Sequence, residues 1–178
     1  MALSADAVEQ YTQGRLPADD PETARLLGAA LAAAQRYCGW PVLFTEDDVV
    51  TLDGPGCSLL VLPTLRLIEL TSVVEDGTEL DVADLTWSPR GLVRKRPGSY
   101  RLGWTAEFGG LVVTMNHGFE SAPDFESAVL SAVDRVSAEV GGARSVVGPF
   151  QYPTSAVGAA FTAYERSILD SYRLERQP

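Results

Sequence analysis

The feature that most constrains this chain is the change of pattern at Gly39-Trp40-Pro41. Glycine suits the left-handed residue that closes a helix, and a proline two positions later prevents the helix from continuing. Before this point the sequence is rich in alanine, and after it short β-branched runs alternate with turn residues. The chain must therefore pass from helix to sheet here.

Two helices are predicted before that point. Residues 5–15 can form a short helix that ends before Pro17. A stronger start signal lies at Asp20-Pro21, because aspartate caps a helix well and proline fits the first helical turn. Five small or apolar side chains then recur three or four residues apart and predict a buried stripe: Ala24, Leu27, Leu31, Ala34 and Cys38.

Residues 41–119 predict short antiparallel strands, since turn residues recur about every ten positions. The dipeptide Asp76-Gly77 is the clearest hairpin signal, because both residues tolerate a positive φ. The last strand is apolar enough to be central in its sheet. The predicted strands cover residues 49–52, 59–62, 67–74, 85–87, 92–94 and 111–116.

Helical periodicity returns at Pro123-Asp124 and ends at Gly141-Gly142. This helix is predicted to present one apolar stripe made of Phe125, Val129, Val133, Val136 and Val140. The glycine- and proline-containing residues that follow it predict a linker or arm. A final amphipathic helix is indicated by Val157, Phe161, Tyr164, Ile168 and Tyr172.

These elements predict an α+β fold in three parts. Residues 1–40 and 120–142 form a small helical bundle that is the core. Residues 41–119 are an inserted antiparallel β meander, resembling a small sandwich or barrel. Residues 143–178 form a C-terminal arm and helix.

The composition bounds the classes of function. With 46% hydrophobic and 21% charged residues, the 178-residue chain is typical of a globular protein rather than a disordered one. It lacks an apolar run long enough to span a bilayer and a signal-peptide start, so we expect a soluble protein with no membrane partner. The formal net charge of −10 argues against general binding of nucleic acid through its phosphates.

Few residues could support catalysis or bind a metal. One histidine and two cysteines without CxxC or HxxxH spacing predict no metal and no cofactor, with Cys38 and Cys57 as structural thiols. His117 follows a strand, where a base could stand, but no nucleophile motif accompanies it, so a turn or capping role is expected. A ligand-binding or hydrolytic β module built on Trp87, Trp104, Tyr100 and His117 is the alternative.

Residues 88–101 break the acidic pattern of the chain. They carry a local charge of +5 and no acidic residue, which leaves −15 on the rest of the chain. Such a segment is either a solvated hairpin face or a docking surface for an acidic neighbour, another copy of the chain, or passing DNA. The basic residues are Arg90, Arg94, Lys95, Arg96 and Arg101.

The arm and final helix hold more aromatic residues than a short terminal helix needs, and tyrosine is a favoured interface residue. We therefore expect this segment to dock outside its own subunit. The candidate partner-binding residues are Phe150, Tyr152, Phe161, Tyr164, Ile168 and Tyr172.

The order of several short motifs resembles that of the head-to-tail adaptor (head-tail connector) proteins of long-tailed bacteriophages. The helix end Cys38-Gly39-Trp40 with Val42 is the first of them. The resemblance extends over about residues 21–140, with a weaker echo at residues 165–173. The later motifs are residues 50–54, 60–64, 72–77, 87–91 and 112–119, followed by Pro123-Asp124.

The resemblance implies a structural virion protein of the neck, assembled in the host cytoplasm, and not an enzyme. Such adaptors form a ring, typically of twelve copies, between the portal protein and the stopper or tail proteins. The ring extends the channel through which double-stranded DNA passes without sequence-specific binding. A stopper or tail-terminator ring of the same neck is the nearest alternative.

Overall fold

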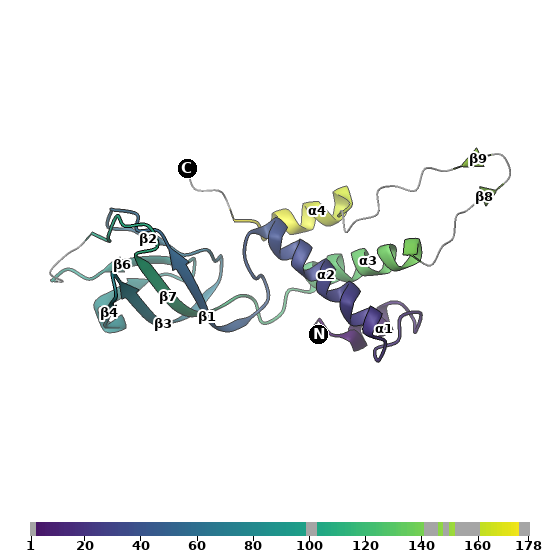
Figure 1. The fold of residues 1–178 in the computed structure, drawn as a ribbon, viewed down its shortest axis with the longest axis horizontal. Helices are drawn as coiled ribbons and strands as arrows, with labels where there is room; N and C mark the ends of the chain where they lie inside the picture. The colour runs from purple at the N-terminus through teal and green to yellow at the C-terminus, as the bar shows by residue number, and fades with distance from the viewer. Residues whose placement is uncertain (1–2, 99–102, 141–145, 148–149, 152–160, 175–178) are drawn as a thin grey trace. The chain divides into compact units, whose positions relative to one another are not determined.

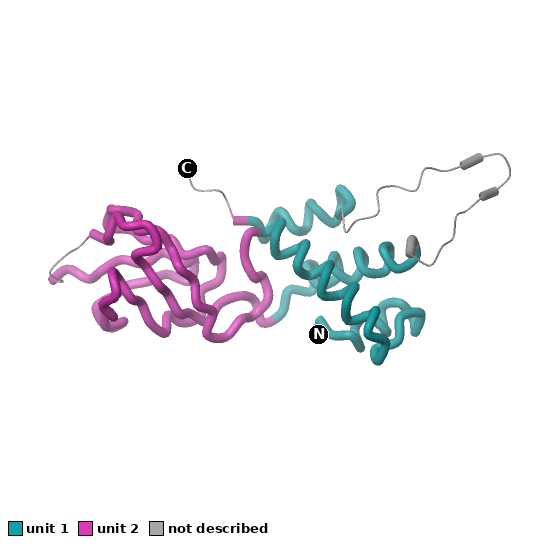
Figure 2. Tube along the Cα trace, viewed as in Figure 1, with its two compact units in different colours: residues 1–38, 121–173 teal, residues 39–120, 174–178 magenta. Residues whose placement is uncertain are grey.

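The computed structural model of the chain describes residues 3–98, 103–140, 146–147, 150–151 and 161–174. These residues form helices and antiparallel sheets, which confirms the predicted α+β class (Figure 1). Two compact units are distinguished, one of residues 1–38 and 121–173 and the other of residues 39–120 and 174–178 (Figure 2). The β unit is thus inserted between two helices of the helical unit.

The helical unit is built around α3 (Pro123–Val140), which packs against α1 (Ala5–Tyr11), α2 (Pro21–Cys38) and α4 (Ala163–Asp170). Its central position explains why α3 is buried on more than one side. Fully or almost fully buried side chains include Phe125, Ala128, Val129, Ala132 and Val133. No helix of the described residues is both long and apolar enough to cross a bilayer.

The start of α2 is formed as predicted, but its buried face is not. Asp20 accepts the Glu22 amide hydrogen bond at 2.9 Å and precedes Pro21. The buried positions are Thr23, Leu26, Ala30, Ala34 and Cys38. The prediction was wrong for Ala24, which is exposed, and for Leu27 and Leu31, which are half-buried. An alanine-rich helix offers several possible stripes, and the packing partner decides which is buried.

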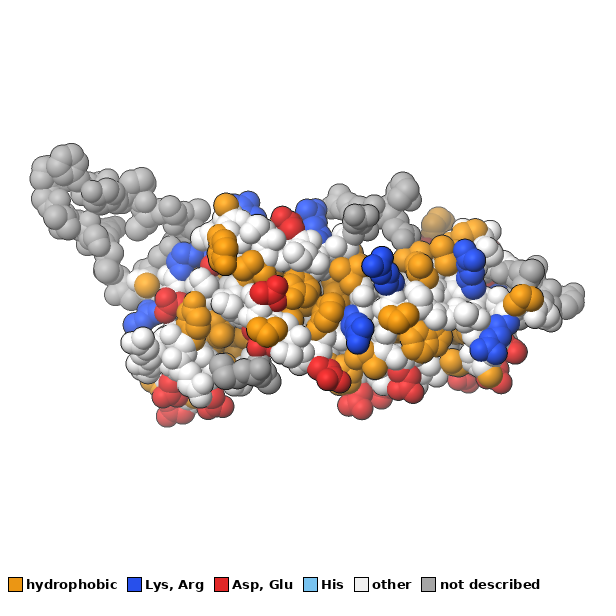
Figure 3. Space-filling model, turned by 180° about the vertical axis from the view of Figure 1, so that it is seen from behind, with side chains coloured by type: hydrophobic (Ala, Val, Ile, Leu, Met, Phe, Trp, Pro, Cys, Tyr) orange, Lys and Arg blue, Asp and Glu red, His pale blue; other side chains and the backbone are white. Residues whose placement is uncertain are grey.

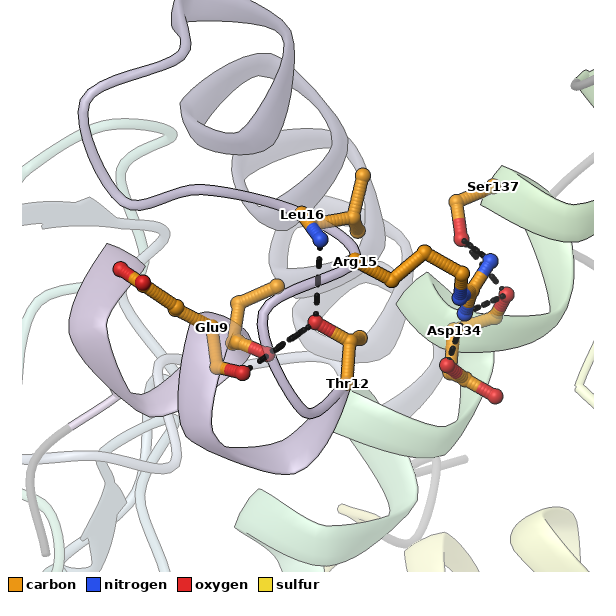
Figure 4. A network of polar contacts seen from close by, with 7 residues as sticks. Glu9, Thr12, Arg15, Leu16, Asp134 and Ser137 are labelled. Carbon is orange, nitrogen blue, oxygen red and sulfur yellow. Dashed lines mark hydrogen bonds and ion pairs between the residues drawn. The ribbon is translucent and has the colours of Figure 1, made fainter.

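The segment after α1 is tied to α3 by Arg15 (Figure 4). Its guanidinium pairs with the Asp134 carboxylate and donates a 3.0 Å hydrogen bond to the Ser137 hydroxyl. Thr12 fixes the turn, since its hydroxyl donates to the Val8 carbonyl at 2.8 Å and accepts from the Leu16 amide at 3.2 Å. These contacts hold the N-terminal helix on the bundle although the helix is only 7 residues long.

The β unit consists of two antiparallel sheets. The four-stranded sheet has the order β1-β7-β3-β4, and the three-stranded sheet has the order β2-β6-β5. The strands of the first sheet are β1 (Thr45–Leu52), β3 (Leu67–Glu75), β4 (Thr78–Leu80) and β7 (Leu111–His117). Those of the second are β2 (Leu60–Val61), β5 (Leu85–Trp87) and β6 (Leu92–Lys95), with a short 3-10 helix, η1 (Val82–Asp84), before β5. The strands β8 (Val146–Val147) and β9 (Phe150–Gln151) form a separate pair in the arm.

The two sheets share one apolar core, as predicted for a small sandwich, but the predicted meander was wrong, because β7 lies between β1 and β3 and β2 pairs with β6. Strand β7 alternates between buried and half-buried residues and pairs with β1 on one side and β3 on the other, so its predicted central place is confirmed. The β3–β4 hairpin turns at Asp76-Gly77, both of which have positive φ, as predicted. The core is formed by Leu60, Leu62, Leu67, Leu70, Val73, Leu85, Val93, Trp104, Leu111, Val113 and Met115.

The entry and exit of the β unit are joined to each other. Gly39 has a φ of 86°, the left-handed conformation predicted for the end of α2. The Phe119 amide donates to the Val42 carbonyl at 2.8 Å, and the Phe44 amide donates to the Phe119 carbonyl at 3.0 Å. Gly118, directly before Phe119, has a φ of 97°, and a Cβ there would lie 2.4 Å from the Leu43 carbonyl oxygen. Only glycine fits this position.

We predict that Gly118→Ala lowers the free energy of unfolding of the β unit by about 2–4 kcal/mol, through strain at positive φ and the clash with Leu43. Urea denaturation followed by tryptophan fluorescence measures this. The control is Gly103→Ala, because a Cβ at Gly103 meets nothing within 4 Å. A Gly118→Ala protein as stable as the control would contradict this reading of the junction.

Candidate functional site

The basic segment predicted as a docking surface lies on the β5–β6 hairpin. Arg90, Arg94 and Arg96 are exposed, and Arg96 also donates from Nε to the Leu85 carbonyl oxygen at 3.2 Å. Arg101 lies outside the described residues. On the face shown in Figure 3, basic side chains of the β unit are interspersed with hydrophobic ones, and acidic side chains line its lower edge. Because Leu92 of the same hairpin is 38% exposed, the hairpin presents both basic and apolar side chains.

Lys95 differs from the other basic residues because its side chain points into the unit. Its ammonium lies 2.6 Å from a Glu75 carboxylate oxygen and 3.0 Å from the Gly103 carbonyl oxygen, and 4.7 Å from the centre of the Trp104 ring. The Lys95 side chain is 6% exposed and that of Glu75 is 14% exposed. The pair is therefore part of the internal structure of the β unit, and Lys95 contributes no charge to the exposed hairpin surface.

The same Glu75 carboxylate also holds the loop that precedes β7. Its second oxygen accepts the Thr105 amide hydrogen bond at 2.8 Å. Trp104, which was considered as a ligand platform, is 3% exposed and belongs to the core of the β unit. Burying a charged pair is favourable only when both groups are well hydrogen-bonded, and the three contacts to Glu75 and Lys95 meet that condition.

The final helix packs within the helical unit. Glu165 is 3% exposed and closes a capping box with Thr162, whose amide donates to the Glu165 carboxylate at 2.7 Å. Burial would raise the pKa of Glu165, but hydrogen bonds from Thr162 and Ser131 and the nearby charge of Arg135 leave that pKa below its ordinary value. Leu169 is fully buried, so α4 contributes to the core of this unit.

The end of α4 is also joined to the end of α2. The Tyr37 hydroxyl donates to Asp170 at 2.6 Å, and the Cys38 thiol donates to the Leu169 carbonyl at 3.6 Å. Burial raises the pKa of the Cys38 thiol to about 11, as expected for a structural thiol, whereas Cys57 is free and exposed. The sequence pattern had set residues 143–178 apart from the bundle, but α4 shares the bundle's core.

The six predicted partner-binding residues therefore have different positions. Phe161 is 7% exposed, and Tyr172 donates its hydroxyl hydrogen to Asp124 and packs edge-on against Phe125, with ring centres 5.7 Å apart. Burial and this hydrogen bond raise the pKa of Tyr172. Ile168 is half-buried, and Tyr164 is 76% exposed. The side chain of Phe150 and the whole of Tyr152 lie outside the described residues.

His117 does not have the turn or capping role expected from the sequence. It ends β7, is fully buried, and its Nε2 lies 3.1 Å from an Asp48 carboxylate oxygen. Its ring lies 5.9 Å from the ring of Trp40, and its Nδ1 has no hydrogen-bond partner among the described residues. The imidazole is therefore packed at the end of β7 between the Asp48 carboxylate and the Trp40 indole.

Among the described residues, no three histidine, cysteine, aspartate or glutamate side chains are grouped as metal ligands. The surface does contain one residue that sequence reasoning missed. Phe108 is 91% exposed, the highest fraction of any large hydrophobic side chain described. The available signal was its place in the turn sequence Glu107-Phe108-Gly109-Gly110, where a large apolar residue has no interior to enter.

The sequence matches no family model and no curated protein. Solved structures are similar over the whole chain. A chain in the neck of a native gene transfer agent particle, computed with C12 symmetry, has a TM-score of 0.65 and 17% identity, covering 100% of this chain and 94% of that one. Chains in the neck of the empty particle, computed with C6 symmetry, and in the virion of the native particle have TM-scores of 0.63 and 0.56, each at 16% identity and covering 100% of this chain and 95% of theirs.

This is the fold of a gene transfer agent neck protein. The neck fold includes both units of the chain, because the similarity leaves no residue of this chain uncovered. The helix-sheet-helix order derived from the sequence is therefore the order of the neck fold. At 16–17% identity the comparison concerns the fold, and the roles of individual residues rest on their own geometry.

We predict that Lys95→Met lowers stability by about 2–4 kcal/mol, because it leaves the Glu75 carboxylate in the protein interior without its cation. The melting temperature should fall by several degrees, at about 2–4 °C per kcal/mol for a protein of this size. Arg94→Met is the matched control, since this neighbouring side chain is exposed and should change stability by no more than about 0.5 kcal/mol. Equal melting temperatures for the two variants would show that the pair is not structural.

Proposed function

We propose that this chain is a structural neck protein of a tailed-phage-like particle and acts as its head-to-tail adaptor. In this role it forms a ring between the portal protein and the stopper or tail proteins and extends the DNA channel. The observation that carries the proposal is the match of the complete chain to chains of a particle neck. The motif order from Cys38 to Phe119 supports the adaptor position within the neck.

The same comparison supports a ring of twelve copies, because one of the similar necks was computed with C12 symmetry. A closed ring requires two different, complementary surfaces on each copy. The acidic chain also suits a channel for DNA, since negative walls repel phosphates and allow the duplex to slide. The proposed role is structural rather than catalytic, and the burial of His117, the chain's one histidine, supports that view.

We propose that two surfaces mediate assembly. The exposed part of the basic hairpin, Arg90, Arg94 and Arg96, contacts an acidic surface of the adjacent copy. The exposed face of α4, with Tyr164 in its first turn and the half-buried Ile168 one turn later, contacts the portal protein. Tyr164 is suited to this role because a 76% exposed tyrosine offers a large amphipathic contact area at low entropy cost.

The first test is assembly with the portal protein of the same particle, analysed by native mass spectrometry. We expect twelve copies of the 19.1 kDa chain on each portal ring. Arg90→Glu with Arg94→Glu should weaken ring formation most at low salt, since the Debye length falls from about 10 Å at 0.1 M to about 3 Å at 1 M. Arg25→Glu with Arg36→Glu on α2 is the control, and an equal effect of both pairs would exclude a specific role for the hairpin.

The second test concerns the portal contact. Tyr164→Ala should weaken binding to the portal by about 1–2 kcal/mol, or roughly 5–30-fold in the dissociation constant, with the fold unchanged. Tyr11→Ala is the matched control, because Tyr11 is an exposed tyrosine on α1 of the same unit. Unchanged portal affinity for Tyr164→Ala, measured by biolayer interferometry, would remove α4 from the contact. Binding to a tail component alone would instead favour a stopper or terminator.

A further inference from the structure

The most exposed large hydrophobic residue, Phe108, lies at the tip of a firmly held loop. The Glu107 carbonyl oxygen accepts the Gly54 amide hydrogen bond at 2.9 Å, and the Thr105 carbonyl oxygen accepts that of Gly56 at 2.9 Å. On the other side of Phe108, the Gly110 carbonyl oxygen accepts from the Asp76 amide at 2.8 Å. The phenyl ring is therefore presented by a loop whose backbone is already ordered, which lowers the entropy cost of binding.

The turn that places Phe108 outward depends on its neighbours. Gly109 has a φ of 63°, and its amide donates to the Asp53 carboxylate at 2.7 Å. A Cβ at Gly110 would lie 2.8 Å from a carboxylate oxygen of Asp76, so this carboxylate also lies against the loop. Asp53, Asp76 and Glu107 are all exposed. Phe108 is thus an apolar tip with an acidic rim.

A surface of the opposite kind lies on the three-stranded sheet of the same unit. Leu92 is 38% exposed on β6 and pairs with the half-buried Val61 of β2. Arg94 follows on the same face of β6, because side chains two residues apart on a strand share a face. Arg66 and Arg90 are also exposed, and they lie near each other at the β5–β6 turn, since the Leu67 amide donates to the Pro89 carbonyl at 2.7 Å. This surface is apolar at its centre and basic at its rim.

Arg66 and Arg90 of this basic surface lie at the start of strand β3 and the Phe108 loop lies at its end, whereas Arg94 precedes Lys95, whose ammonium reaches Glu75 at the Phe108 end. Leu67 at the start of β3 contacts the β5–β6 turn, whereas Asp76, directly after the end of the strand at Glu75, contacts the Phe108 loop. Eight strand steps at about 3.3 Å each separate Leu67 from Glu75 by about 26 Å. Phe108 therefore lies far from Arg66 and Arg90 of its own copy, so a contact of the Phe108 loop with these two arginines joins different copies head to tail.

We propose that Phe108 is the side chain with which one copy of this chain binds the next copy. Its ring packs against Leu92 of the neighbour, while the acidic rim of Asp53, Asp76 and Glu107 faces the neighbour's Arg66 and Arg90. The partner is a second copy of this chain, because the two surfaces match: both are apolar at the centre, and one rim is acidic where the other is basic. This inference rests on the proposed ring and specifies the surface that closes it.

The test compares variants by mass photometry of rings assembled across a range of protein concentrations. Phe108→Ala should raise the concentration needed for assembly at least about thirtyfold, as expected for an interface hot spot. Val49→Ala is the control, because Val49 is 61% exposed on β1 and lies outside both surfaces. Both side chains are exposed, so the melting temperature should not change for either variant.

A charge exchange identifies the partner surface. Glu107→Arg and Arg90→Glu should each weaken assembly about tenfold, whereas the two together in one chain should restore most of it, because each contact between copies again joins opposite charges. Normal rings with Phe108→Ala, or a combined variant no better than either single one, would overturn the inference and leave the proposed ring intact. No ring from the unsubstituted chain, with or without portal protein, would overturn the proposed function and this inference with it.

Discussion

The β unit depends on the closure of its two ends. An insertion between two helices must return the chain to the place where it left, and here the returning strand is joined to the outgoing one through residues 42–44 and Phe119. Trp40 packs beside this junction, with its ring 5.9 Å from that of His117 and 6.1 Å from that of Phe119. The junction is therefore both hydrogen-bonded and apolar, and the register of β7 against β1 and β3 starts from it.

This closure gives the inserted unit two distinct ends. The connected end holds the junction and the basic hairpin turn, which contacts the start of β3. The other end holds the Phe108 loop, fixed by Asp53 and Asp76 and by the internal pair of Lys95 with Glu75. A rigid body with different surfaces at its two ends suits repeated head-to-tail contact, since little conformational freedom is lost when each copy binds the next.

Local signals in the sequence predicted most of the elements. Gly39 ends α2, Asp76-Gly77 forms the hairpin turn, and the apolar run at residues 111–116 is the central strand, because each depends on a few neighbouring residues. Features set by tertiary packing could not be predicted from the sequence. The buried face of α2 depends on which helix packs there, and α4 joins the bundle through Leu169 and the buried Glu165, which an excess of aromatic residues does not reveal.

For the candidate site residues too, local sequence signals were predictive and effects of tertiary packing were not. The basic hairpin was apparent from the sequence, yet Lys95 was counted with the exposed cations although alternation along β6 puts it on the same face as buried Val93. His117 could be placed at a strand end, but its burial against Trp40 depends on the closure of the unit. Phe108 was missed because the sequence analysis looked for groups of similar residues, and Phe108 is a single apolar side chain in a turn.

The central claim is that this chain is a ring component of the neck, and a symmetric cryo-electron microscopy reconstruction of the particle's head-tail junction tests it most directly. The account predicts a ring between portal and tail into which both units of the chain fit, with one copy in each twelvefold repeat. A neck without density for this chain, or density for the chain elsewhere in the particle, would contradict it.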